Sequence, residues 1–339
     1  MKTYAGIDLH SSNNYIVVID DKDKRLFEKR LPNTIEDVST ALKPYKKSLV
    51  SVVVESTCNW YWLIDGLQTL GYPISLANPN AIQQYDGLKH TDDKWDSFWL
   101  AHMVRLNILP TGYIYPKETR AVRDLLRRRL LYVHEKTTHI LSLQSMIVRN
   151  LGSRLSGNNI KKLKLDDIQK MFDSEYLAFT AIKHIETIDF LKKAIKDIEK
   201  KVLAMASLKK EFDLLKTIPG IGVILALTIM LEAGDINRFE KVGNYSSCCR
   251  CVRSDKERNG KKKGENNKKN GNKYLSWAYV EAANFSIRYS PEAQRFYQKK
   301  KAKRNGIVAI KAVSNKIARA SYYIMRDQVP YDEKKLFNN

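Results

Sequence analysis

Strand-like and helix-like hydrophobic patterns alternate over the first third of the chain. The β-rich and helical periodicities predict strands at 4–9, 15–20, 26–30, 51–54 and 74–77, and helices at 35–47, 60–70 and 94–107. The continuous valines at 52–54 predict a strand that is covered on both faces. Residues 1–115 are therefore predicted to form one domain around a mixed α/β sheet.

The pattern changes at residue 117 to that of a long charged helix. Leu126, Val133, Ile140 and Ile147 recur at every seventh position, which indicates a coiled-coil seam or a helical hairpin. Residues 152–167 are predicted to form a loop, and a second helical stretch from 174 to 210 packs on the first helix or on a second protomer. Residues 116–210 are thus predicted to be a helical, coiled-coil region.

The remaining residues, 211–339, predict a mainly α-helical C-terminal domain. A turn at Pro219 and Gly220 separates two apolar helical stretches, and Gly222 follows it. Glycines in this arrangement let the backbone approach a phosphate. An ordinary tight turn between helices fits the same spacing, so both interpretations stay open.

The net charge of the chain indicates which class of partner it binds. Lys and Arg number 59 against 37 Asp and Glu, a net charge of +22, which indicates a polyanionic partner. No run approaches the ~20 apolar residues that a membrane span needs, and the N-terminus enters a strand-like segment without a signal peptide. We therefore expect a soluble, intracellular protein that binds nucleic acid and no membrane.

The most basic stretch lies in the predicted glycine- and lysine-rich loop at 253–273. Between Arg250 and Lys273 there are ten basic residues against three acids. Cations on a flexible backbone suit contact with phosphates more than reading of bases, although a solvated loop fits the composition equally. The predicted phosphate contacts are Lys261, Lys262, Lys263, Lys268, Lys269 and Lys273, together with Gly220 and Gly222.

Three closely spaced cysteines raise the question of a zinc site: Cys248, Cys249 and Cys251. The adjacent pair cannot form a C-x-x-C knuckle, and no histidine follows in the C-terminal half. Buried apolar thiols are the better prediction.

Four acids predict a metal site. Asp8 lies at the end of the first strand and Glu55 at the end of the valine-rich strand, where ligands collect at the edge of a sheet. Asp93 and Asp96 are three apart at the start of a helix and share one face. Helix capping by Asp92 or Asp93 leaves Asp96 unexplained. Four carboxylates suit a pair of Mg²⁺ or Mn²⁺ ions about 3.5–4 Å apart.

These acids carry a resemblance to a known family. The matching segments are Gly6-Ile7-Asp8, Glu55-Ser56-Thr57, Asp93-x-x-Asp96 before Leu100-Ala101, and residues 271–283. In this order they resemble the DEDD transposases of the Piv-type insertion-sequence family (IS110 group, IS1111 branch). The resemblance covers essentially the whole chain.

The resemblance implies an RNase H-like, RuvC-like N-terminal domain in which Asp8, Glu55, Asp93 and Asp96 bind the catalytic metals. It also implies a C-terminal transposase domain and guidance by a structured non-coding RNA. The leading hypothesis is a transposase that cleaves and joins double-stranded DNA, at element ends and target, as a dimer or tetramer. Such an enzyme is expected in a bacterial-type cytoplasm, associated with the nucleoid.

One position departs from the family. The resemblance implies a nucleophilic serine just before Asn259-Gly260-Lys261, but Arg258 stands there, and Ser254 replaces the serine only if the loop shifts register. Arginine cannot attack a phosphodiester. Two alternatives therefore stay open: a catalytically impaired nucleic-acid-binding protein descended from a transposase, and a junction-resolving endonuclease, which would not need the C-terminal half.

Overall fold

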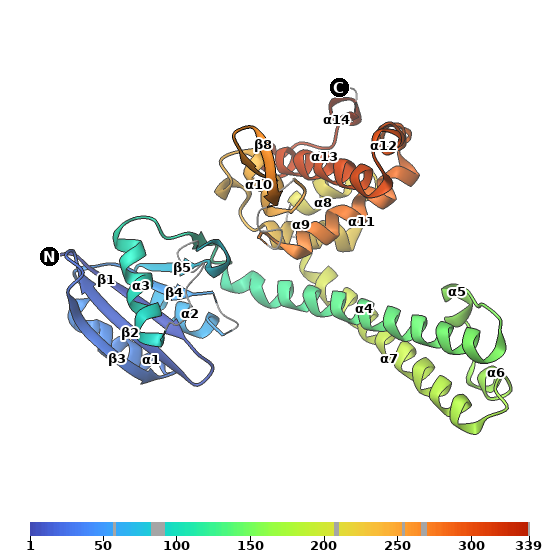
Figure 1. Ribbon diagram of the computed structural model, residues 1–339, viewed down its shortest axis with the longest axis horizontal. Coiled ribbons are helices and arrows are strands. Elements are labelled where there is room, and N and C mark those ends of the chain that lie inside the picture. Colours follow the sequence, from blue (N-terminus) through green and yellow to red (C-terminus); the bar gives the residue numbers. More distant parts are fainter. Residues whose placement is uncertain (57–58, 83–91, 207–209, 253–254, 266–269, 338–339) are drawn as a thin grey trace. The chain divides into compact units, whose positions relative to one another are not determined.

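The computed structural model describes residues 1–339 except 57–58, 83–91, 207–209, 253–254, 266–269 and 338–339. The chain divides into two compact units, Met1–Lys117 and Glu118–Asn339 (Figure 1). In the part of the chain that is described, no helix has both the length and the apolar character needed to cross a lipid bilayer.

A six-stranded mixed sheet forms the centre of the first unit, in the order β3-β2-β1-β4-β5-β6. Its strands are β1 (Thr3–Leu9), β2 (Asn13–Asp20), β3 (Arg25–Pro32), β4 (Leu49–Glu55), β5 (Ile74–Ala77) and β6 (Thr111–Gly112). The first three strands pair antiparallel, β4 runs parallel to β1, and β5 runs parallel to β4. The predicted mixed α/β sheet is confirmed.

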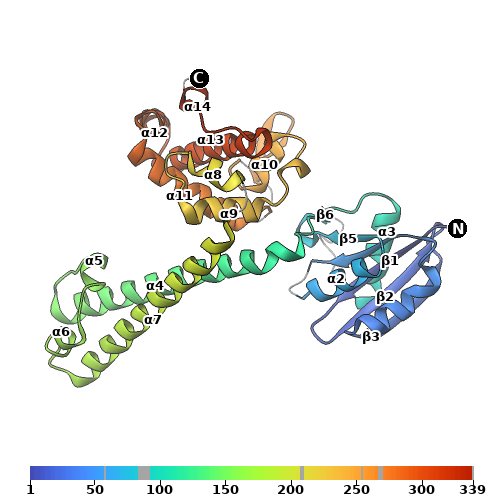
Figure 2. The ribbon, with the colours of Figure 1, turned by 180° about the vertical axis from the view of Figure 1, so that it is seen from behind.

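Helices cover both faces of this sheet (Figure 1 and Figure 2). They are α1 (Ile35–Leu42), α2 (Tyr61–Thr69) and α3 (Asp93–Arg105). Val52 and Val54 pack on the face covered by α1 and α2, whereas Val53 packs against α3, because successive side chains of a strand point to opposite faces. Helix α1 stops short of its predicted end at 47, since Pro44 lacks the N–H that the helix needs and lies in a 3₁₀ turn.

Gly6 of β1 lets α3 approach the sheet closely. A Cβ at this position would lie 2.0 Å from the carbonyl oxygen of Ser97 and 2.8 Å from the amide nitrogen of Ala101. Both atoms belong to the backbone of α3, so no rotation of a side chain could make room. A glycine two residues before Asp8 therefore brings the start of α3 next to the end of β1.

Two long helices open the second unit, α4 (Lys117–Leu151) and α7 (Glu175–Ala206). Their facing residues Ile140, Leu143 and Ile147 pack with Ala181 and Ile185. The second helical stretch therefore packs back on the first within one chain, as one of the two alternatives predicted. Of the four residues in the heptad pattern, only Val133 is not fully buried.

The connection between these helices was predicted to be a loop, and this is wrong in part. It contains α5 (Gly157–Ile160) and α6 (Leu165–Gln169). Each short helix buries one isoleucine, Ile160 or Ile168, in the core between α4 and α7. The basic composition of the segment concealed these two anchors.

The C-terminal part is mainly α-helical, as predicted. Its helices are α8 (Lys210–Lys216), α9 (Val223–Ala233), α10 (Val242–Cys248), α11 (Lys273–Tyr289), α12 (Pro291–Lys303), α13 (Gly306–Asp327) and α14 (Glu333–Phe337). Leu126 of α4 and Val202 of α7 belong to the same core as these helices. A domain boundary between residues 210 and 211 stays a prediction.

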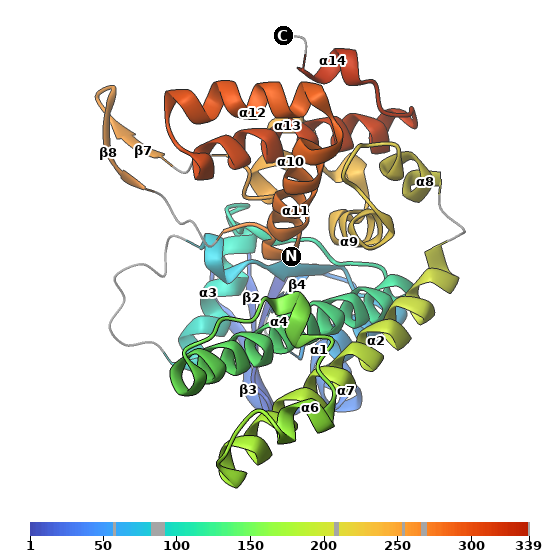
Figure 3. The same cartoon turned by 90° about the vertical axis from the view of Figure 1, so that its right-hand side faces the viewer.

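The predicted loop at 253–273 contains a hairpin of β7 (Asp255–Arg258) and β8 (Lys261–Glu265), as Figure 3 shows. Asn259 and Gly260 form its turn with φ angles of 53° and 68°. Asn-Gly is the residue pair that accepts positive φ at both turn positions. The sequence therefore carried a hairpin pattern that its lysine content obscured.

The cysteines agree with the prediction of buried thiols. Cys249 is fully buried and Cys251 nearly so, whereas Cys248 is half-buried. Burial raises the pKa of the Cys251 thiol to about 12. Cys58 lies outside the described residues.

Candidate metal centre

Two of the predicted acids follow neighbouring parallel strands to the same edge of the sheet. The register of β1 and β4 places Ile7 opposite Val54, and Asp8 and Glu55 are the next residues on their strands. Asp8 is 6% exposed and Glu55 is half-buried. Because parallel strands end at the same edge, the two carboxylates share one environment.

The other two acids lie in the first turn of α3. Asp92 is the N-cap, and its side chain accepts a 2.7 Å hydrogen bond from a backbone amide of that turn. Capping therefore does not require Asp93 or Asp96. The buried Ser97 side chain accepts a 3.3 Å hydrogen bond from the amide of Asp8, which ties the start of α3 to the end of β1.

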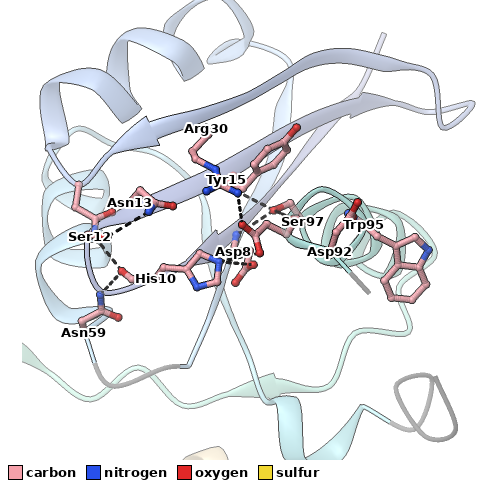
Figure 4. A network of polar contacts seen from close by, with 12 residues as sticks. Asp8, His10, Ser12, Asn13, Tyr15, Arg30, Asn59, Asp92, Trp95 and Ser97 are labelled. Carbon is pink, nitrogen blue, oxygen red and sulfur yellow. Dashed lines mark hydrogen bonds and ion pairs between the residues drawn. The ribbon is translucent and has the colours of Figure 1, made fainter. Parts of the chain in front are cut away.

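A histidine and an arginine join these acids (Figure 4). The Nε2 atom of His10 lies 3.2 Å from Oδ2 of Asp8 and 3.1 Å from Oδ1 of Asp93. The Nη2 atom of Arg30 donates a 2.5 Å hydrogen bond to Oδ2 of Asp93. Among the described residues, Asp8, His10 and Asp93 form a group whose ligand atoms all lie within 4.8 Å of one another.

The carboxylates also interact electrostatically. Burial raises the pKa of Asp8; the charge of His10 opposes this shift and the charge of Asp93 adds to it. Burial likewise raises the pKa of Glu55, and the negative charges of Asp8 and Asp96 raise it further. The four acids from β1, β4 and α3 therefore act on one another within one crowded site.

This set of donors fits a hard divalent cation. Carboxylate oxygens are the ligands that Mg²⁺ and Mn²⁺ prefer. Asp8 and Glu55 are two carboxylates whose pKa is raised. A bound cation would offset their mutual repulsion and stabilise their ionised forms. Arg30 supplies positive charge, but it contacts Asp93, and the pKa of Glu55 stays raised.

The sequence interpretation missed His10 and Arg30. His10 lies two residues after Asp8, a spacing at which side chains of an extended chain share a face. Arg30 could be found only from the sheet, because Asp8 pairs with Tyr15 of β2 and Tyr15 pairs with Arg30 of β3. Asp8, Tyr15 and Arg30 thus lie side by side on three adjacent strands, and this register places the arginine next to the acids.

The two glycines of the C-terminal turn have different surroundings. Gly220 has a φ of +94°, and a Cβ there would lie 2.5 Å from the amide nitrogen of Ser286 and 2.6 Å from the carbonyl oxygen of Ala282. Close packing on α11 therefore accounts for this glycine. Gly222 precedes α9 and has open space around it. Contact of either glycine with a phosphate stays a prediction.

The basic residues predicted to bind nucleic acid belong to the second unit. Lys261, Lys262 and Lys263 are exposed on β8, and Lys273 is exposed at the first position of α11. Lys268, Lys269 and Ser254 lie outside the described residues. Arg258 is exposed at the end of β7, directly before the Asn-Gly turn.

Comparison with known proteins assigns the chain to a family. A model of IS110-type DEDD transposases, described as "Transposase", matches residues 5–149, and a second, described as "Transposase IS116/IS110/IS902 family", matches residues 212–298. A curated protein of Sinorhizobium fredii, "Putative transposase y4qE", is 21% identical over 299 residues, which cover 86% of this chain and 73% of that protein. Transposases are enzymes that cleave and recombine DNA. The chain belongs to the IS110 family of transposases.

Proposed function

We propose that the first unit is an RNase H-like, RuvC-like catalytic domain in which Asp8, Glu55, Asp93 and Asp96 bind a pair of divalent ions, Mg²⁺ or Mn²⁺, and cleave DNA strands. One observation carries the proposal: parallel β1 and β4 bring Asp8 and Glu55 to the same edge of the sheet, where carboxylate oxygens of Asp8 and Asp93 both lie within 3.2 Å of Nε2 of His10. Mutually repelling carboxylates in a chain of net charge +22 are best explained by a bound cation. The strand order β3-β2-β1-β4-β5, antiparallel and then parallel, supports such a fold.

Bound divalent ions would activate the attacking oxygen and stabilise the leaving oxygen of a phosphodiester. The residues of the chain hold the ligands in position. Ser97 fixes the backbone at Asp8 through its hydrogen bond, and Arg30 holds one carboxylate oxygen of Asp93. The exposed lysines of β8 would contact the DNA backbone through phosphates and thus bind without reading sequence.

An assay of strand cleavage on DNA that carries the ends of the element tests the proposal. The wild-type protein is expected to cleave with Mg²⁺ or Mn²⁺ and to stop in EDTA. Asp8→Asn is expected to lower the cleavage rate by about 10³-fold, since metal ions supply several kcal/mol of transition-state stabilisation. Equal rates for the two proteins would reject the proposal.

We further propose that the strand-joining step is impaired in this chain. The family resemblance assigns a serine nucleophile to the position of Arg258, and a guanidinium group, which stays protonated at neutral pH, has no hydroxyl oxygen with which to attack the phosphodiester. Arg258→Ser is therefore expected to produce covalent protein–DNA adducts, visible as slowly migrating bands on denaturing gels, where the wild type produces none. Adducts of equal yield from the wild type would contradict this, and Ser254→Ala would then test whether Ser254 is the nucleophile.

The partners are also proposals. The net charge of +22 is compatible with simultaneous binding of double-stranded DNA and of a structured guide RNA from the element. An oligomer, dimer or tetramer, would let one assembly hold two DNA segments. The expected compartment is a bacterial-type cytoplasm, with association to the nucleoid.

A further inference from the structure

The imidazole of His10 lies beside two of the acids that the proposed function assigns to metal binding. Its Nε2 atom lies 3.2 Å from a carboxylate oxygen of Asp8 and 3.1 Å from one of Asp93. In an octahedral site with ligands at about 2.1 Å, adjacent ligand atoms are about 3.0 Å apart. The two distances from Nε2 of His10 therefore match the separation of neighbouring ligands around one ion, and the ligand atoms of all three residues lie within 4.8 Å of one another.

The backbone of His10 is fixed on both sides. Its amide donates a 2.9 Å hydrogen bond to the carbonyl oxygen of Asn13. Its carbonyl oxygen accepts hydrogen bonds from the side-chain amides of Asn33 (2.9 Å) and Asn59 (2.7 Å), the latter drawn in Figure 4. Three anchors from separate segments hold the residue while its imidazole points to the acids, so the ring needs little reorganisation to bind an ion.

The neighbouring acids leave one oxygen each for the same ion. Oδ2 of Asp93 is engaged by Arg30, whereas Oδ1 faces His10. Oδ2 of Asp8 faces His10 from the other side. The donor set at this corner of the cluster is thus two carboxylate oxygens and one imidazole nitrogen.

We propose that His10 is a direct ligand of the divalent ion held by Asp8 and Asp93, and that its nitrogen makes this site prefer Mn²⁺ to Mg²⁺. The inference rests on the proposed metal-dependent function and adds a ligand outside the four acids. Mg²⁺ binds oxygen ligands almost exclusively in proteins, whereas imidazole suits transition-metal ions. A site with one nitrogen ligand therefore favours Mn²⁺ over Mg²⁺, whereas a site of four carboxylates would not discriminate between them in this way.

Electron spin-echo spectroscopy of Mn²⁺ bound to the full-length, metal-depleted protein tests this directly. The wild type is expected to show ¹⁴N modulation from a bound imidazole. His10→Gln is expected to lose the modulation and to bind Mn²⁺ about tenfold more weakly, while its affinity for Mg²⁺ changes much less. His134→Gln, at an exposed position of α4, is the matched control and should keep the wild-type spectrum and affinity.

Two results would overturn the inference in distinguishable ways. If Mn²⁺ binds in an Asp8-dependent manner without ¹⁴N modulation, His10 only bridges the two carboxylates, and the proposed function stands without it. If Mn²⁺ binds no better to the wild type than to Asp8→Asn, both the ligand and the metal-dependent function fail. His10 is 43% exposed in its side chain, so its replacement by glutamine should leave the fold intact, which circular dichroism checks.

Discussion

Glu55→Gln is expected to make the metal-free protein more stable and to slow strand cleavage strongly when metal is supplied. Burial and the charges of Asp8 and Asp96 raise the pKa of Glu55 above its ordinary value of 4.5. The folded state therefore binds a proton more readily than the unfolded state, and ionisation of Glu55 destabilises the fold as the pH rises through the folded-state pKa. Glutamine removes this charge, but it also removes an anionic metal ligand, so cleavage should fall by about 10³-fold.

Thermal unfolding in EDTA, measured as a function of pH, checks the first half of this prediction. At pH 7 the variant should melt above the wild type, and the difference should vanish below about pH 4.5, where Glu55 is protonated in both states. Glu36→Gln, at an exposed position of α1, is the control and should leave the cleavage rate unchanged. A variant that melts below the wild type at pH 7 would mean that the ionised carboxylate stabilises the fold.

Glu232→Gln is expected to cost the second unit about 3–5 kcal/mol of its free energy of unfolding. Glu232 is 2% exposed on α9. It accepts hydrogen bonds from Arg123 (3.0 Å), Arg127 (2.5 and 2.8 Å) and Asn272 (2.7 Å). Burial alone would raise the pKa of Glu232, yet the hydrogen bond from Arg127 and the charges of both arginines hold it below its ordinary value. Removing the carboxylate charge leaves the arginines of α4 without this shared partner.

Chemical denaturation of the variant measures the loss, together with a fall in the melting temperature on the order of 10 °C. Glu186→Gln is the matched control, because Glu186 pairs with Lys183 on the surface of α7 with both side chains about half exposed. Exposed pairs of this kind contribute less than about 1 kcal/mol. Equal losses from the two substitutions would contradict the special role of the buried cluster.

The fold of the first unit could be predicted from local pattern because most of its strands are apolar and its turns are polar. The valines of β4 indicated a strand buried on both faces, the β-rich run at residues 4–9 indicated a strand, and acids at strand ends indicated a site. What could not be predicted depends on pairing between strands: Arg30 reaches the acids only through the register of β1, β2 and β3. His10 could have been found from its spacing to Asp8.

The second unit was harder to predict because packing overrides composition there. Ile160 and Ile168 order a segment whose polar residues suggested a loop. The hairpin of β7 and β8 depends on Asn259 and Gly260, a pattern hidden among lysines. Gly220 owes its identity to contact with α11, which the turn sequence alone could not distinguish from contact with a phosphate.

Anomalous X-ray scattering from crystals grown with Mn²⁺ tests most directly whether the acids at the edge of the sheet hold metal. The expected result is a peak in the anomalous difference map within coordination distance of Asp8 and Asp93, with Glu55 and Asp96 lining the same density. Crystals with saturating Mn²⁺ and no peak among these four side chains would contradict the proposed chemistry.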